Sequence, residues 1–494
     1  MPRITRRRLL RTIAAAAPTG ALLVRAGRAA QKAGPDKGPN LLFVFADQMR
    51  GQALGFLAED PVLTPNLDRF AGRSLVLPQA VSNYPVCSPY RAMLMTGRWP
   101  HANKVLSNCN SRSAPYGNEL QVSDRCWSDV LKDKGYSLGY IGKWHLDAPR
   151  RPFVKSYNNS EKFAWNEWCS PDRRHGFDFW YAYGTFDHHN SPEYWSTNMK
   201  RHERVKARQW GPEHEADLAI RYIRNEGGKY RKAGRPFALV VSMNPPHTPY
   251  NQVPQKYVDR YEGKTYKDLL NRPNVDLSSD ARAVKVAKSQ IRNYFAMVSG
   301  VDEQFGRIVE ALDQQGLAKD TIVVFTADHG NCIGSHNWAT KNVHWEESMR
   351  VPFLIRWPGR IKPRHDGLRI STPDIYPTLM DLMGFRADVP AAVAGVSHAS
   401  LMLTGRGPRP ASQPYMWVPP GKPALGRRGV RTARYTLVIT KAEGTGDQTV
   451  LHDNVADPYQ LKNIAADRPD VVRKLTETEL IPWLKRTGDP WLKT

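Results

Sequence analysis

The sequence predicts an α/β fold in which helices flank a large, mostly parallel central sheet, followed by a smaller C-terminal α+β domain with an antiparallel sheet. Three observations support this fold class. Short apolar runs alternate with helical patterns, polar residues directly follow several of these runs, and the pattern changes after about residue 360. We expect a targeting segment at 1–34, a first domain at 38–365 and a smaller domain at 366–494.

The strands of the first domain are expected where short apolar runs occur. These runs are 40–46, 137–141, 237–243, 321–326 and 352–357. Continuous apolar runs are typical of strands that are buried on both faces, as in a parallel sheet. Helical spacing occurs between them at 123–134, 213–225 and 289–315. The alternation of the two patterns therefore predicts crossover connections and a mostly parallel sheet.

The C-terminal part has a different pattern. Residues 371–384 have a proline-capped start and a glycine stop, which predicts a helix. Residues 385–425 are rich in Pro, Gly and Ala and are expected to form a loop. Residues 428–440 and 448–452 alternate like antiparallel strands, and a last helix is expected at 471–485.

The chain of 494 residues is strongly basic, with a formal net charge of +24. A basic protein favours polyanionic partners, of which sulfated polysaccharide and nucleic acid are the obvious candidates, but a solvated basic surface is an equally good interpretation. The sequence contains no zinc-finger spacing and no helix-turn-helix pattern, so we expect no nucleic-acid partner.

The N-terminus has the features of an export signal. The stretch Thr5-Arg6-Arg7-Arg8-Leu9-Leu10-Arg11 resembles a twin-arginine motif, and an apolar run follows at 12–24. Pro18 and Gly20 interrupt that run, which is too short to span a bilayer. We therefore expect a periplasmic or secreted protein that uses the twin-arginine export machinery and has no stable membrane anchor. A disordered basic tail is the alternative.

The five cysteines show no paired CxxC spacing, so a structural zinc site is not expected. In an exported protein, one or two disulfides could form among Cys109, Cys126, Cys169 and Cys332, and the spacing leaves their connectivity open.

Cys87 lies in the most informative stretch, Tyr84 to Arg98. Pro89 is suited to the first turn of a helix, and Met93 and its neighbours continue that helix. Cys87 is thus expected at a helix N-terminus, where free N–H groups and the helix dipole favour negative charge. The alternative is a buried cysteine beside a helix cap.

Polar side chains follow four of the predicted strands directly. They are Asp47 after the first, Lys143 and His145 after the second, His247 after the third, and Asp328 and His329 after the fourth. The carboxyl ends of parallel strands meet at one edge of a sheet, so these side chains are expected to lie together. Each residue alone has an ordinary alternative, such as a helix-capping aspartate, a packed histidine or a solvated lysine.

Together these motifs resemble the type I sulfatases of the alkaline-phosphatase-like superfamily, from Pro39 to about residue 465. Cys87-Ser88-Pro89-Tyr90-Arg91 is similar to the site at which those enzymes convert cysteine to formylglycine. Phe45-Ala46-Asp47-Gln48 and Thr326-Ala327-Asp328-His329-Gly330 are similar to the two metal motifs. Gly142-Lys143-Trp144-His145 and Asn244-Pro245-Pro246-His247 are similar to segments that bind sulfate, and the segment from Lys341 to Pro352 is similar to the one that holds a substrate lysine.

The resemblance implies a role for each of these residues. The ligands of one divalent metal would be Asp47, Gln48, modified Cys87, Asp328 and His329. Lys143 and Lys341 would bind sulfate oxygens, and Arg91 would hold the formylglycine hydrate. One hydroxyl of the hydrate would attack sulfur while His247 or Lys341 protonates the leaving alcohol, and His145 would take the proton of the second hydroxyl. The substrate would be a sulfated carbohydrate or an aryl sulfate, and a formylglycine-generating enzyme would be a partner.

Two positions depart from the commonest family pattern. Many sulfatases have a second Asp where Gln48 stands and an Asn where His329 stands, and the Gln/His pair also occurs in related phosphonate monoester and phosphodiester hydrolases. Calcium is the family default, but a nitrogen ligand suits manganese or another transition ion. Lys143-Trp144-His145 favours sulfate over phosphorus esters. An inactive carbohydrate-binding relative with unmodified Cys87 is a further alternative.

Residues 150–210 are expected to be rich in loops and aromatic side chains, and the loops at 150–210 and 385–425 are expected to set substrate specificity. Core packing is the usual role of aromatic residues, and shaping a carbohydrate site is the competing one. The aromatic residues are Trp165, Trp168, Phe177, Phe179, Trp180, Tyr181, Tyr183, Phe186 and Trp195, with His188, His189 and Asn190 among them.

Overall fold

In the computed structural model, strand β1 (Asn40–Ala46) lies inside a ten-stranded sheet of order β10-β2-β9-β8-β1-β7-β3-β4-β5-β6. It pairs in parallel with β8 (Thr321–Ala327) and with β7 (Phe237–Met243), and β7 pairs in parallel with β3 (Ser137–Lys143). These four strands are almost entirely buried. The prediction of a mostly parallel sheet from their continuous apolar runs is thus confirmed.

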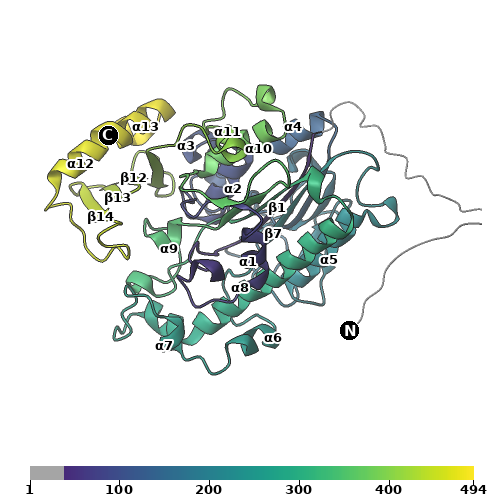
Figure 1. Ribbon diagram of the computed structural model, residues 1–494, viewed down its shortest axis with the longest axis horizontal. Coiled ribbons are helices and arrows are strands. Elements are labelled where there is room, and N and C mark those ends of the chain that lie inside the picture. Colours follow the sequence, from purple (N-terminus) through teal and green to yellow (C-terminus); the bar gives the residue numbers. More distant parts are fainter. Residues whose placement is uncertain (1–37, 494) are drawn as a thin grey trace, which may run out of the picture. The chain divides into compact units, whose positions relative to one another are not determined.

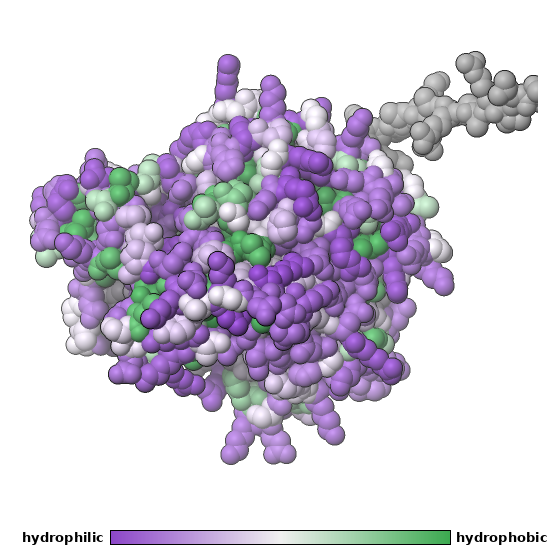
Figure 2. Space-filling view, turned by 60° about the horizontal axis from the view of Figure 1, so that its bottom comes forward, coloured by the Kyte–Doolittle hydropathy of each residue, from purple (hydrophilic) through white to green (hydrophobic). Residues whose placement is uncertain are grey.

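The structure describes residues 38–493, and the predicted leader at 1–34, with its export motif, lies outside them. The described residues belong to one compact unit that begins at Gly38. None of its helices combines the length and the apolar character that crossing a membrane requires. The space-filling view in Figure 2 shows a mostly hydrophilic face with hydrophobic residues in small, scattered groups.

Strands at both ends of the sheet differ from the sequence prediction. The run at 352–357 forms β9 (Phe353–Arg356), which is antiparallel to β8 and not parallel as expected. The prediction was wrong because the connection from β8 stays at the same edge of the sheet, so the chain re-enters in the opposite direction. Five further strands of this sheet were not expected. Three come from the aromatic region 150–210, namely β4 (Phe179–Tyr183), β5 (Glu193–Ser196) and β6 (Val205–Lys206). The other two, β2 (Leu75–Val76) and β10 (Arg364–His365), lie beyond β9 at the opposite end of the sheet.

Two groups of helices cover the sheet, and Figure 1 shows β1 and β7 between them. One group is α1 (Pro65–Ala71), α5 (Gly211–Arg224) and α8 (Arg282–Gln314). The other is α2 (Cys87–Thr96), α4 (Trp127–Asp133) and α10 (Ile375–Leu382). The predicted helices at 123–134, 213–225, 289–315 and 371–384 correspond to α4, α5, α8 and α10, with shifted ends.

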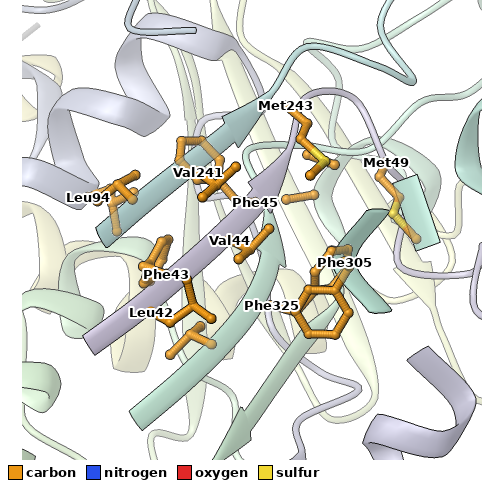
Figure 3. Close-up of a cluster of buried hydrophobic side chains, with 14 of the residues drawn as sticks. Leu42, Phe43, Val44, Phe45, Met49, Leu94, Val241, Met243, Phe305 and Phe325 are labelled. Atoms are coloured by element: carbon orange, nitrogen blue, oxygen red, sulfur yellow. The ribbon is translucent and has the colours of Figure 1, made fainter. Parts of the chain in front are cut away.

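Alternate residues of β1 pack against the two helical layers, as the pleat of a strand requires. The side chains of Leu94 on α2 and Phe305 on α8 lie at opposite ends of the apolar cluster in Figure 3. Phe305 contacts Phe325 of β8 with ring centroids 4.8 Å apart. Because both faces of the sheet are covered, the carboxyl ends of its strands are the places where polar side chains can gather.

A second sheet of four antiparallel strands contains β11 (Ser412–Trp417), β12 (Gly426–Thr432), β13 (Tyr435–Lys441) and β14 (Gln448–Asp453). Helices α12 (Pro469–Leu475) and α13 (Ile481–Thr487) accompany it, at the yellow end of the chain in Figure 1. The predicted antiparallel unit and last helical segment are confirmed.

The expected loop at 385–425 is a partial error, because it contains α11 (Ala399–Thr404) as well as β11. Pro414 obscured β11 in the sequence, and it is tolerated because β11 is an edge strand. The remaining short helices are α3 (Pro100–Asn103), α6 (Gln255–Val258), α7 (Tyr266–Leu269) and α9 (Glu346–Met349).

The second sheet holds the segment that leads into α2. Asn83 accepts a hydrogen bond from the backbone N–H of Met416 through its own carbonyl, and its side chain donates to the carbonyl of Pro414. The Tyr84 hydroxyl accepts from the N–H of Val418. Arg431 on β12 forms a buried ion pair with Glu346 at the start of α9, at 2.6 Å. These contacts fix the position of Cys87 from the C-terminal side of the chain.

Candidate active site

Cys87 is the first residue of α2, and Val86 before it is extended with φ −145° and ψ 141°. The Ser88 hydroxyl donates to the carbonyl of His145, and the Ser88 N–H donates to the side chain of Asn108. The Cys87 residue is only 1% exposed. The helix N-terminus therefore presents a buried sulfur atom to the edge of the sheet, at the position that the sequence predicts.

Two aspartates follow neighbouring strands at equivalent positions. Ala46 of β1 pairs with Ala327 of β8, and the N–H of Asp328 donates to the carbonyl of Ala46. The register therefore places Asp47 and Asp328 side by side, and both are fully buried. With Cys87 and His329 they form a cluster whose potential ligand atoms all lie within 4.8 Å of one another.

Arg91, one turn into α2, holds both carboxylates. Its guanidinium lies 3.0 Å from Asp328 Oδ2 and 3.2 Å from Asp47 Oδ2, and it also donates to the Ser242 hydroxyl. From the sequence, Arg91 is expected to hold the side chain of residue 87. These hydrogen bonds go to the two aspartates instead. Like a residue behind the ligands of a metal, Arg91 fixes the two carboxylates through their Oδ2 atoms, whereas Asp47 Oδ1 is the oxygen that lies 3.7 Å from Cys87 Sγ.

The ring orientation of His329 is fixed by its own neighbour. Nδ1 lies 2.9 Å from the carbonyl oxygen of Gly330, which can only accept, so Nδ1 carries the hydrogen. Nε2 then presents a lone pair to the cluster, at 3.3 Å from Cys87 Sγ and 3.4 Å from an oxygen of each aspartate. This is the tautomer that a metal-binding imidazole needs.

Gln48 turns away from β1 with a positive φ of 68°. Its N–H donates to Asp328 Oδ1, and its side-chain nitrogen donates to the Tyr250 hydroxyl at 2.9 Å. The same hydroxyl accepts from the Asn331 amide. Tyr250 thus holds the nitrogen of Gln48, which leaves the amide oxygen as the atom that could bind a cation.

These donors fit a divalent cation. Two buried carboxylates and an imidazole nitrogen lie beside residue 87, and the Gln48 amide oxygen is left available by the hydrogen bond that holds its nitrogen. Burial and the neighbouring Asp47 charge raise the pKa of Asp328, because the two carboxylates repel each other. A cation would relieve this repulsion, and oxygen ligands of this kind suit calcium while the nitrogen also suits manganese.

Two lysines face Cys87. Lys341 Nζ lies 3.3 Å and Lys143 Nζ lies 3.9 Å from Sγ, and Lys143 also pairs with Asp47 Oδ2 at 2.6 Å. Burial and the Asp47 charge raise the pKa of the thiol, but Lys143 and Lys341 together hold it well below its ordinary value. The surroundings of residue 87 are therefore built to stabilise negative charge there.

The two histidines differ in exposure. His145 is 2% exposed, its Nε2 lies 3.1 Å from the carbonyl oxygen of Cys109, and Nδ1 has no hydrogen-bond partner among the described residues. Burial lowers the pKa of His145, which favours the neutral ring that can accept a proton. His247 is less buried, and its Nδ1 lies 2.8 Å from the carbonyl oxygen of Thr248 and 3.4 Å from Asp187 Oδ1.

Sequence reasoning missed Asp187 and the role of Asn244. Lys143 donates to Asn244 Oδ1 at 3.0 Å, and the nitrogen of the same amide donates to Asp187 Oδ1 at 3.3 Å. Burial raises the pKa of Asp187, but His247, Lys143 and His189 hold it below its usual range. Asn244 belongs to a motif that the sequence analysis quotes for His247, whereas nothing in the aromatic region 150–210 distinguishes Asp187.

All five cysteines are buried and free, so the disulfides that the sequence leaves open are not formed. Cys126, Asp129 and His175 make a second group of possible ligands, in which Asp129 already accepts hydrogen bonds from the Cys126 N–H and from His175. That carboxylate is satisfied as part of the cap of α4.

Comparison with family models decides the classification. The model named Sulfatase matches residues 39–385, and the one named N-sulphoglucosamine sulphohydrolase, C-terminal, matches residues 334–481. The chain belongs to the sulfatase family. The resemblance stated from its motifs is thus confirmed, and this sulfatase is a sulfuric ester hydrolase.

Two relatives of this sulfatase are similar over most of its length. An endo-4-O-sulfatase of Bacteroides thetaiotaomicron is 40% identical, covering 92% of this chain and 93% of the relative. An ulvan-active sulfatase of Formosa agariphila is 33% identical, covering 86% of this chain and 77% of the relative.

Two solved structures share the fold closely. A Bacteroides fragilis protein assigned as a sulfatase has a TM-score of 0.90 at 46% identity, covering 94% of this chain and 99% of its own. A structure from work on glycosaminoglycan metabolism by Bacteroides thetaiotaomicron has a TM-score of 0.86 at 38% identity. The match covers 92% of this chain and 98% of the other. The predicted fold class is confirmed by these similarities.

We predict that Asp187→Asn slows sulfate-ester hydrolysis by about tenfold or more, because His247 loses the carboxylate that orients it. The measurement is kcat and KM for an aryl sulfate. Asp172→Asn, at an exposed aspartate, is the control, and an unchanged kcat in Asp187→Asn would contradict this role.

Proposed function

We propose that this sulfatase is an exported enzyme that removes sulfate from a sulfated carbohydrate, through a formylglycine hydrate made from Cys87 and with one divalent cation. The observation that carries the proposal is the position of Cys87 Sγ. It lies at the N-terminus of α2, between two lysine ammonium groups and beside two carboxylates and an imidazole.

The carbohydrate substrate is supported by the relatives. One is named for endo action on 4-O-sulfate, one for activity on ulvan, and one structure comes from work on glycosaminoglycans. The basic composition of this chain is consistent with a polyanionic substrate of that class.

The cation proposed for this site would be bound by Asp47, Gln48, Asp328 and His329 together with modified residue 87. Calcium is the first choice, and manganese the alternative that His329 makes reasonable. When bound, such a cation lowers the pKa of a hydroxyl on residue 87 and polarises sulfate oxygens. Arg91 maintains the ligand positions through its hydrogen bonds to both aspartates.

The hydrate explains why residue 87 would have to be modified. A formylglycine-generating enzyme, with an external two-electron oxidant, would convert the carbon that bears the thiol to an aldehyde while the sulfur leaves as sulfide, and water adds to give two hydroxyls. One hydroxyl attacks sulfur and the substrate alcohol leaves. The other then loses its proton, the C–O bond to sulfate breaks, and the aldehyde returns. A serine ester has no second hydroxyl, so water would have to attack a shielded sulfur.

The side chains around residue 87 supply binding and proton transfer. Lys143 and Lys341 bind the sulfate oxygens as point charges. His247, oriented by Asp187, gives a proton to the leaving alcohol, for which Lys341 is the other donor within the site. His145, buried with an unpartnered Nδ1, accepts the proton of the second hydroxyl.

Export rests on the twin-arginine motif at Thr5 to Arg11, which lies outside the described residues. A periplasmic or secreted enzyme without a membrane anchor would meet extracellular sulfated polymers directly.

Parallel kinetics on matched esters test the reaction. We expect kcat/KM for an aryl sulfate to exceed that for the corresponding phosphodiester and phosphonate monoester, because the Lys143-Trp144-His145 motif favours sulfate over phosphorus esters. A large preference for the phosphorus esters would overturn the assignment and favour the phosphonate monoester or phosphodiester hydrolases.

The modification of residue 87 is tested by mass spectrometry of its peptide. In protein produced natively, we expect the peptide to have the mass of formylglycine, and Cys87→Ala to lose about a thousandfold or more in kcat. Cys169→Ala, at a buried cysteine outside the cluster, should retain activity. An intact thiol in fully active enzyme would contradict the mechanism.

Removal of the cation is the remaining test. Dialysis against a chelator should abolish hydrolysis, and calcium or manganese should restore it with one bound ion per chain by elemental analysis. Asp328→Asn should weaken ion binding by about tenfold or more, whereas Asp172→Asn should not. Full activity in protein that holds no ion would disprove the proposed site.

A further inference from the structure

A pocket of about 380 Å³ lies in the region 150–210. Its lining combines basic and aromatic side chains with one carboxylate. The charged and aromatic groups are Lys155, Tyr157, Phe186, His188, Glu193, Arg204 and Lys206. None of them belongs to the catalytic cluster, and a pocket of this size accommodates a sugar unit.

The pocket carries positive charge. Its carboxylate, Glu193, is already paired with Arg204 at 3.0 Å. Lys155 and Lys206 are exposed, and neither forms an ion pair within residues 38–493. Two free ammonium groups at one concave site favour an anionic ligand, and water screens them only in part inside a pocket.

Tyr157 adds an aromatic surface to the pocket. It is 61% exposed, which is unusual for a large ring in this protein, yet its position is defined by His188 and Phe186 at ring-centroid distances of 5.3 and 6.1 Å. An exposed ring of fixed orientation offers an apolar face to the C–H groups of a sugar, while the neighbouring cations bind its acidic substituents.

The pocket is connected to the catalytic residues through the segment 186–188. The carbonyl of Phe186 accepts from the Asn244 amide at 2.9 Å, and the oxygen of that amide accepts from Lys143. On the same segment, Asp187 pairs with His247 and forms two hydrogen bonds with Asn158, the residue after Tyr157. Phe186 and His188 thus line the pocket while Asp187, between them, contacts a catalytic histidine.

We propose that this pocket binds an anionic sugar unit, carrying sulfate or a uronate carboxylate, that is linked to the unit from which the active site removes sulfate. This inference rests on the proposed function and deepens it. The preferred substrate is then an oligosaccharide or polymer with acidic groups on successive units, and a sulfated monosaccharide or aryl sulfate uses only part of the site.

The test compares two substrates in pocket variants. The probes are a tetrasaccharide of alternating uronate and 4-O-sulfated amino sugar, and 4-nitrophenyl sulfate. We expect Tyr157→Ala and Lys206→Glu each to lower kcat/KM for the tetrasaccharide by about tenfold, chiefly through KM, with a far smaller change for the aryl sulfate. For the wild type, raising the ionic strength should lower kcat/KM for the tetrasaccharide by a similar factor. It should not lower kcat/KM for 4-nitrophenyl sulfate to that degree.

Matched controls are Tyr266→Ala, at another exposed tyrosine, and Lys319→Glu, at an exposed lysine beside the opposite end of β8. Both should leave the ratio of the two kcat/KM values unchanged. The proposal is overturned if the double variant Tyr157→Ala, Lys206→Glu keeps the wild-type ratio.

A binding measurement separates failure of the pocket from failure of the proposed function. In the Cys87→Ala background, calorimetric titration with the tetrasaccharide should give a Kd about tenfold weaker when Tyr157→Ala is added. If the wild type hydrolyses no sulfate ester, the proposed function fails and this Kd alone decides on the pocket. An unchanged Kd rejects the pocket even in an active sulfatase.

Discussion

The pairing of Asp47 and Asp328 is the constraint on which the rest of the site depends. Parallel register between β1 and β8 brings the two carboxylates together in a fully buried region, where neither charge is stable alone. Arg91 and Lys143 pair with them and offset that cost. The two aspartates place acidic groups at the edge of the sheet, and α2 begins there with its N-terminus facing the same cluster.

Much of this arrangement could be predicted from the sequence, because β1, β3, β7 and β8 are continuous apolar runs followed by polar residues. Strand ends in a parallel sheet converge, so order along the chain was enough to bring Asp47 and Asp328 together. The direction of β9 could not be predicted, since a run of apolar residues carries no information about the path of the connection before it. The strands β4 to β6 were hidden by aromatic residues that suit both loops and strands.

The partners of individual side chains were harder to predict than their positions. The sequence places Arg91 beside Cys87 on α2, but whether its guanidinium points toward residue 87 or the aspartates depends on three-dimensional packing. Asp187 escaped prediction for the same reason, because its link to His247 joins a loop to the end of β7. Electrostatic networks between distant segments have no periodic pattern in sequence.

Under the proposed conversion of Cys87 to formylglycine, the near-complete burial of this residue dictates the order of folding and modification. A modifying enzyme must bind several residues around its target. Here those residues form α2, which packs between the sheet and the C-terminal strands. The thiol is therefore available only on a nascent or unfolded chain. A host that lacks the modifying activity would yield a chain that folds normally and cannot be activated afterwards. Solubility and correct folding therefore do not indicate what fraction of the purified protein carries the modified residue 87.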